Sequence, residues 1–351
     1  MSLDRTAQWV QRGIERGWHT SCQVAIVGGN GVETAAWGTL GGTAVTADTP
    51  FPLTCLTKPI IATAIGHAAD DGLLDLTQPV ARYVPAFAGH GRERVTLVEL
   101  LTHTAALDGD PVPIAGDERG SADRVRTLAP RRTRPRTAAF SAFANWFILA
   151  EVLEAASGMA HDRYVDEHIL GPLDIDAIDL APSARSTRPG AAVLDLRGGD
   201  LPVDAFRGWF EGIRAWPGVT GLGTAEAVAL FFRGILSAVT SDSNAAVRPE
   251  VARTLVRPWR VGLHDDVTGD DLTWGLGFTV DARMLGRRVS AATFSHAGLR
   301  ASSFAFGDPA SGAAAAVIYD RVLDPATAMM RHAGTVSAVI HDSGTTKARP
   351  G

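Results

Sequence analysis

The sequence predicts an α/β (α+β) fold in which an antiparallel sheet, built from both chain ends, is flanked by helices and carries an inserted, mostly helical lobe. Three observations predict this fold: strand patterns near both chain ends, helical patterns between them, and turns rich in Gly, Pro and Asp at the junctions. Because strands from opposite ends must meet to complete one sheet, the helical middle forms a second lobe. A cleft between two lobes is a common ligand site.

The N-terminal part begins with a charged amphipathic helix pattern in MSLDRTAQWVQRGIERGW. Two apolar strand patterns follow at 22–27 and 32–37, and the GGNG between them predicts a hairpin turn. From 55 to 76 the apolar residues recur at helical spacing. A hairpin of the sheet therefore leads into a helix.

Helical patterns fill the middle of the chain, at 97–101, 146–156, 161–170 and 225–236. Strand patterns return in WGLGFTV, RRVSAATFSHAG, ASSFAFGD and AAAAVIYD, and a last helix is expected over 326–340. We therefore assign 1–75 and 268–342 to the sheet lobe, 76–267 to the helical lobe and 343–351 to a mobile tail.

The composition is that of an ordinary globular protein, with 46% hydrophobic and 20% charged residues among 351. A net charge of -5 gives no electrostatic basis for a nucleic-acid partner. No apolar run approaches the ~20 residues that cross a bilayer, so no membrane partner is expected. Because the N-terminus does not resemble a signal peptide, we expect a cytoplasmic protein.

Two cysteines, Cys22 and Cys55, are too few for a disulfide framework or a zinc site, and we expect neither a metal nor a cofactor. Cys22 lies in the apolar run CQVAIVGG, which favours a small core residue. Cys55 stands at the start of a predicted helix, where the exposed N–H groups and the helix dipole favour a negatively charged nucleophile. The two thiols therefore predict different roles.

Lys58 follows Cys55 by three residues, on the same face of the predicted helix. Its amine can accept the proton of the thiol or pair with the thiolate. A Cys-x-x-Lys spacing alone is a weak signal, since such pairs arise often by chance. The flanking residues add the specificity that the pair lacks.

The stretch FPLTCLTKPIIATAIGHAADDGLLDLTQPVARYVPAF resembles the active-site helix of the class C β-lactamase, DD-peptidase and family VIII esterase group. This group belongs to the serine β-lactamase-like, or penicillin-binding-protein-like, superfamily, whose nucleophile is the serine of Ser-x-x-Lys. Here Cys55 takes the serine position. The resemblance covers nearly the whole chain and implies a β-lactamase/transpeptidase-like fold.

SHAGLRASSFAFGDP resembles the strand that carries the group's third motif, written here as His296-Ala297-Gly298. The resemblance implies that His296 faces the cleft, where it would orient or protonate a leaving group. It also implies an oxyanion hole made by the backbone N–H groups of Cys55 and Leu299. Gly298 and Arg300 are candidate substrate-binding residues, Arg300 through a substrate carboxylate.

The second motif of the group, Tyr-x-Asn, is altered in PRTAAFSAFANWFILAEVLE. An ungapped register puts Ser141 at the tyrosine and Phe143 at the asparagine, whereas a register shifted by two puts Phe143 at the tyrosine and keeps Asn145. We prefer the first, in which Ser141 relays a proton, and keep Phe143 and Asn145 as substrate-binding candidates. A thiol, with a pKa of about 8.5, ionises readily beside a cation and depends less on the missing tyrosine.

These residues predict an acyl-transfer enzyme with a covalent S-acyl intermediate on Cys55, assisted by Lys58, Ser141 and His296. The expected partners are a small-molecule acyl donor and acceptor, with an ester or a carrier-bound thioester as donor. One alternative is a hydrolase of esters or amides with the same fold. Another is a binding protein that has kept the cleft and lost catalysis.

Overall fold

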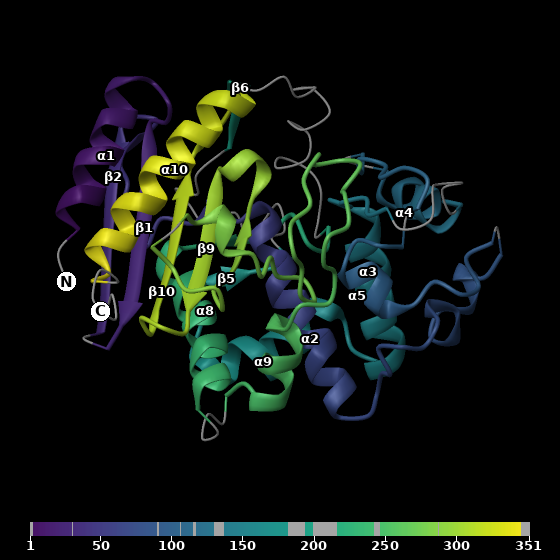
Figure 1. Ribbon diagram of the computed structural model, residues 1–351. Helices are drawn as coiled ribbons and strands as arrows, with labels where there is room; N and C mark the ends of the chain where they lie inside the picture. The colour runs from purple at the N-terminus through teal and green to yellow at the C-terminus, as the bar shows by residue number, and fades with distance from the viewer. Residues whose placement is uncertain are drawn as a thin grey trace.

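The computed structural model describes residues 3–344 except 30, 90, 106, 115–116, 130–136, 182–193, 199–215, 242–245 and 287. A six-stranded antiparallel sheet, in the order β3-β2-β1-β10-β9-β8, joins the two chain ends (Figure 1). Its strands are β1 Ser21–Gly28, β2 Gly31–Leu40, β3 Thr43–Ala44, β8 Phe294–Ala297, β9 Ser303–Asp308 and β10 Ala313–Tyr319. Cys22 on β1 lies opposite Tyr319 on β10. The predicted sheet built from both ends is confirmed.

Helices cover both faces of this sheet (Figure 1). The terminal helices α1 (Asp4–Glu15) and α10 (Pro325–Asp342) pack together on one face and enclose a small apolar core with β1 and β10. On the other face, α8 (Ala225–Thr240) packs against β1, β9 and β10. Although α8 falls in the segment that we assigned to the helical lobe, its packing joins that segment to the sheet.

The helical part of the molecule packs around α2 (Thr57–Asp70), which is buried along most of its length and follows the short 3-10 helix η1 (Thr54–Leu56). The other helices are α3 Leu97–Leu101, α4 Glu118–Arg126, α5 Ala144–Ser157, α6 His161–Val165, the π-helix η4 Asp166–Leu170 and α9 Pro249–Val256. Thr96 and Glu99 form a capping box that starts α3. Helix α5, by contrast, follows Phe143, and the side chain of Phe143 does not cap it.

Short elements connect the two parts. Two small sheets are formed by β4 Phe51–Pro52, β7 Leu222–Gly223 and β5 Ile178–Asp179, and by β6 Asp195–Gly198 with β11 Arg321–Leu323. The remaining 3-10 turns are η2 Val80–Arg82, η3 Pro85–Phe87, η5 Gly171–Leu173, η6 Ala282–Met284 and η7 Leu299–Ala301. The β4–β7 pair places the segment before Cys55 beside Gly221, whose carbonyl accepts a hydrogen bond from the Leu53 amide at 2.8 Å.

One strand prediction is wrong. WGLGFTV folds as a tight turn in which Trp274 bridges to Thr279 and the Gly275 amide donates to the Phe278 carbonyl at 2.8 Å. Gly277 has a φ of 75°, and a Cβ there would lie 2.4 Å from the Ala62 methyl group on α2. The glycines allow a close turn against α2, which a strand pattern cannot anticipate. Of the predicted tail, 345–351 lies outside the described residues.

Candidate active site

Cys55 lies at the entrance of α2, where the sequence placed it. Its side chain is 7% exposed, and the residue before it, Thr54, has a φ of 52°. A positive φ is uncommon for a non-glycine residue and more so for a β-branched one. Strained backbone of this kind concentrates at functional sites. The strain at Thr54 therefore marks the turn that presents the Cys55 sulfur.

Lys58 is fully buried, and its amine makes three hydrogen-bonding contacts. Nζ lies 3.3 Å from Cys55 Sγ, 2.9 Å from the carbonyl oxygen of Ala142 and 2.7 Å from that of Gly218. The rings of Trp146 and Phe140 lie 5.5 and 5.8 Å from Nζ, within the range of a cation–π contact. The predicted Cys55–Lys58 pair is therefore in direct contact.

The two carbonyls determine the direction of the third hydrogen-bonding position of Lys58 Nζ. A carbonyl oxygen only accepts hydrogen bonds, so the Ala142 and Gly218 contacts each use one N–H of Lys58. In the ammonium form the remaining N–H faces the sulfur, and in the amine form the lone pair faces it. In both forms one proton lies between Nζ and Sγ. This geometry is that of a base held against a nucleophile.

Burial controls the charge of this pair and of the histidine near it. Burial lowers the pKa of Lys58 from its ordinary value, while the adjacent Cys55 opposes that shift. His296 on β8 is 2% exposed, and burial together with the Lys58 charge lowers its pKa to about 3. His296 is therefore neutral near pH 7. Of the two roles expected for it, the neutral form favours orientation over donation of a proton by an imidazolium.

Ser141 lies at the start of α5, but its hydroxyl group is directed to a residue that the sequence reading missed. Ser141 Oγ donates to Asp110 Oδ1 at 2.8 Å and accepts from the Asn145 amide at 3.0 Å. Within the described residues, no hydrogen bond joins this hydroxyl to Cys55 or Lys58. The proton relay through Ser141 stays a prediction. The observed hydrogen bonds of Ser141 help to fix the segment that carries the Ala142 carbonyl.

Asp110 is a partly buried carboxylate that caps α5 from a distant loop. It accepts hydrogen bonds from the backbone amides of Ala142, Phe143 and Ala144, at 2.5, 3.2 and 2.7 Å. Burial raises the pKa of Asp110, and these donors oppose the shift. An anion at a helix N-terminus satisfies amides that have no partner inside the helix. Asp110 thereby fixes the segment whose Ala142 carbonyl holds Lys58.

The two remaining residues of the altered motif are buried beside this segment. Phe143 is 7% exposed, and Asn145 donates from Nδ2 to the Leu100 carbonyl of α3 at 3.0 Å. This bond ties α5 to α3. Substrate contact by Phe143 and Asn145 stays a prediction, as does the register of the motif.

The strand opposite Cys55 carries the third motif on a tight turn. Arg300 and Ala301, which follow Leu299, have φ values of 45° and 53°. The Leu299 amide, predicted to bind an oxyanion, donates to Thr54 Oγ1 at 3.2 Å. The site therefore brings Thr54 and Leu299 together, a contact for which the sequence carries no local signal.

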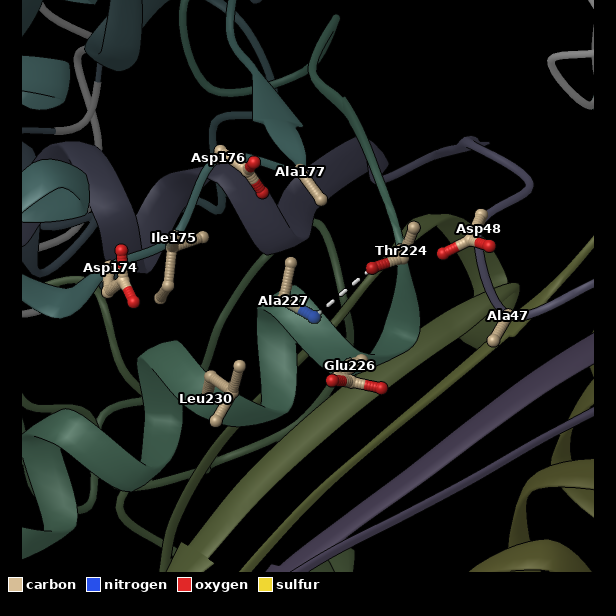
Figure 2. Close-up of a pocket in the computed structure, with 10 residues that line it drawn as sticks. All are labelled: Ala47, Asp48, Asp174, Ile175, Asp176, Ala177, Thr224, Glu226, Ala227 and Leu230. Atoms are coloured by element: carbon tan, nitrogen blue, oxygen red, sulfur yellow. Dashed lines mark hydrogen bonds between the residues drawn. The ribbon is translucent and has the colours of Figure 1, made fainter.

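A separate surface cavity of about 370 Å³ lies at the N-terminus of α8 (Figure 2). Thr224 caps the helix there by accepting a hydrogen bond from the Ala227 amide at 3.2 Å. The lining includes the acidic residues Asp48, Asp174, Asp176 and Glu226. None of the predicted site residues lines this cavity. Across the part of the chain that the structure describes, no group of His, Cys, Asp and Glu side chains is arranged to hold a metal ion.

Comparison with known proteins agrees with this arrangement. The model of the Beta-lactamase family matches residues 6–337. The chain belongs to the Beta-lactamase family. This match confirms the superfamily and the β-lactamase/transpeptidase-like fold predicted from the sequence. The chain is an enzyme of the β-lactamase superfamily, which includes hydrolases and esterases.

Individual relatives of this family member span most of its length. Esterase/beta-lactamase LipL of Mycobacterium tuberculosis is 26% identical over 315 residues, covering 80% of this chain and 71% of LipL. A penicillin-binding protein homologue from Caulobacter crescentus superposes with a TM-score of 0.79 at 20% identity, over 96% of this chain and 97% of that one. EstCE1, described as a hydrolase with promiscuous acyltransferase activity, superposes with a TM-score of 0.75 at 18% identity, over 96% and 98%. These structural likenesses concern the fold.

The described helices of this family member include none that combines the length and apolar character needed to cross a membrane.

Proposed function

We propose that the protein is an acyl-transfer enzyme that forms an S-acyl intermediate on Cys55, with a small-molecule ester or thioester as donor. One observation carries the proposal: both other hydrogen-bonding positions of Lys58 are taken by carbonyls, which leaves its third position for the Cys55 sulfur at 3.3 Å. A nucleophile with a base in hydrogen-bonding contact is the general requirement of covalent catalysis.

The proposed reaction has two steps, and Lys58 carries the transferred proton in both. Cys55 attacks the acyl carbonyl as Lys58 takes the thiol proton; the C–S bond forms, the bond to the leaving group breaks, and Lys58 returns the proton to that group. In the second step Lys58 takes a proton from the acceptor, which attacks the thioester carbon and releases the thiolate. No cofactor takes part in either step. Neutral His296 orients the reacting groups.

A thioester intermediate favours transfer to an amine or alcohol because it stays more activated than an oxygen ester. Hydrolysis, with water as the acceptor, is the competing function, and the esterase relatives of the family support it. The two functions share the first step and differ in the second. Loading and release therefore need separate measurements.

The test is to incubate the protein with a panel of acyl thioesters and activated esters and to weigh it intact. We expect the wild type and Cys22→Ala to gain one acyl group and Cys55→Ala to gain none. Equal labelling of Cys55→Ala and the wild type would refute the covalent intermediate at Cys55. If no donor labels the protein and none is turned over, a binding protein is favoured. Added amines or alcohols should then clear the acyl group faster than water; equal rates would favour the hydrolase.

A further inference from the structure

Thr54 combines a costly backbone conformation with a buried hydroxyl group. Its φ of 52° lies in the region that glycine adopts freely, and its side chain is 1% exposed. A β-branched residue is a poor choice for such a turn unless its side chain makes compensating contacts. The contacts of the hydroxyl group therefore indicate what the residue contributes beside Cys55.

The hydroxyl lies in the middle of a directed chain of hydrogen bonds. Ser303 Oγ donates to the Leu53 carbonyl at 3.1 Å, so its single hydrogen is used there. At the 3.4 Å contact between the two hydroxyls, Thr54 is then the donor and Ser303 the acceptor. The oxygen of Thr54 is left to accept from the Leu299 amide at 3.2 Å. Each group in the chain has one defined direction.

Packing around the turn builds this contact. A Cβ on Gly298 would lie 2.2 Å from Thr54 Oγ1 and 2.1 Å from Ser303 Oγ, so only glycine lets both hydroxyls approach the strand. The Gly298 amide donates to the Ser303 carbonyl at 2.7 Å. On the far side of the turn, Arg331 Nη2 donates to the Ala301 carbonyl at 3.3 Å. The Leu299 amide is thus held against Thr54 from both sides.

We propose that the Thr54 hydroxyl closes the oxyanion hole of the resting enzyme by occupying the Leu299 N–H, and that the reacting carbonyl oxygen must displace it. This inference rests on the proposed function. A neutral carbonyl offers an acceptor no stronger than the hydroxyl, whereas an oxyanion forms a hydrogen bond roughly twice as strong. Thr54 thereby keeps the Leu299 donor from the bound substrate until the stronger hydrogen bond of the developing oxyanion displaces the hydroxyl.

The first measurement follows the Leu299 amide itself. Protein labelled with ¹⁵N-leucine gives a Leu299 signal that the Leu299→Ile variant assigns by its loss. We expect Thr54→Ala to speed hydrogen exchange of this amide about fivefold, the value for loss of one ordinary hydrogen bond. Thr54→Ser restores the hydroxyl and should restore the protection. Unchanged exchange in Thr54→Ala would overturn the proposal.

The second measurement separates a closed oxyanion hole from a role in placing Cys55. Thr54→Ala should raise kcat/KM for acylation by an activated ester about fivefold, mainly through a lower KM, because the freed amide then binds the ground-state carbonyl. Alkylation of Cys55 by iodoacetamide creates no oxyanion and should keep its rate. Slower acylation, or equal changes in both reactions, would overturn the proposal.

Failure of the two proposals can be told apart. If no donor acylates Cys55 in the wild type or the variants, the proposed function fails. Exchange of the Leu299 amide still decides whether Thr54 occupies that donor, because the measurement needs no substrate.

Discussion

The two cysteines of this protein are both buried and both have a cation nearby, yet their surroundings differ in one decisive respect. Cys22 is 0% exposed, and Arg331 is the cation of its region. The guanidinium of Arg331 donates hydrogen bonds to the carbonyls of Trp18, Arg321 and Ala301. It also lies over the Tyr319 ring. Among the described residues, the one hydrogen-bond contact of the Cys22 sulfur is to the Gln23 carbonyl at 3.6 Å, and burial raises the pKa of this thiol.

At Cys55 the cation reaches the sulfur. Lys58 gives its other two hydrogen-bonding positions to backbone carbonyls, and these carbonyls aim the third at Cys55. The comparison teaches that a nearby charge does not make a buried thiol reactive. A polar hydrogen directed at the sulfur, with a small opening to solvent, distinguishes the candidate nucleophile from the core residue.

The largest expected effect tests the comparison directly. Cys55→Ala should lower acyl turnover about 10³-fold or more, because it removes the atom that forms the covalent bond. Steady-state kinetics with an activated ester measures this. Residual turnover within tenfold of the wild type would show that Cys55 is not the nucleophile.

Removing the Lys58 amine that faces the Cys55 sulfur should have the next largest effect. Lys58→Met keeps a side chain of similar length and should slow both acylation and iodoacetamide alkylation of Cys55 at pH 7 by about 10²-fold, the usual contribution of a positioned base. Rates of alkylation followed by intact mass measure the effect. An unchanged alkylation rate would show that Lys58 does not control the reactivity of the thiol.

Asp110 acts on the pair without touching it, through the Ala142 carbonyl and through its charge near Lys58, so its removal should have a smaller effect. Asp110→Asn leaves amides of α5 facing a weaker acceptor and should slow alkylation of Cys55 about tenfold. Asp117→Asn is the matched control, because Asp117 caps the neighbouring helix α4 without contacting Lys58. Equal effects of the two variants would assign the loss to general destabilisation.

Both cysteine regions also contain a buried histidine, which predicts a shared response to acid. Burial lowers the pKa of His19, near Cys22, and of His296, near Lys58, to about 3 in each case. The unfolded chain binds protons at these residues below about pH 6.5. The contribution of each histidine to the free energy of unfolding is therefore fully present above about pH 6.5. It is lost as pH falls from about 6.5 to 3, by about 1.4 kcal/mol per pH unit for each histidine.

Urea unfolding between pH 4 and 6 measures this slope. His19→Asn and His296→Asn should each reduce it by about one proton. Because His19 lies away from Cys55, only the His296 variant should also change acylation. A slope that neither variant alters would show that both histidines titrate in the folded protein.

The smallest effect is expected at the core cysteine. Cys22→Ala should leave acyl turnover unchanged and lower the free energy of unfolding by roughly 1 kcal/mol, the cost of removing one buried sulfur. Denaturant unfolding and ester kinetics on the same sample measure both. A large loss of turnover without loss of stability would contradict the assignment of Cys22 to the core.

Much of the fold could be predicted because its signals are local. The hairpin of β1 and β2 follows from two apolar runs around a glycine turn, and α3 begins at the capping box of Thr96 and Glu99. The strand predicted in WGLGFTV failed because Gly275 and Gly277 allow a turn whose closeness is set by α2. The packing partner, which is distant in sequence, decided that segment.

The candidate site divides in the same way. Cys55 and Lys58 could be paired from their spacing on one helical turn. Asp110, Thr54 and the Gly218 carbonyl could not be found in this way, because each acts on a partner that the chain places far away. The distance from Asp110 to its partners is more than thirty positions of sequence, and that from Thr54 to Leu299 is 245.

By itself the sequence determined which atoms are available: a thiol at the start of a helix, an amine one turn later, and a histidine and glycine on a late strand. The tertiary structure decided what those atoms face. It buried Lys58 between two carbonyls, kept His296 neutral and set the Thr54 hydroxyl on the Leu299 amide. The physical reason is that spacing along a helix fixes neighbours within a turn, whereas burial and hydrogen-bond direction depend on every element that packs around the site.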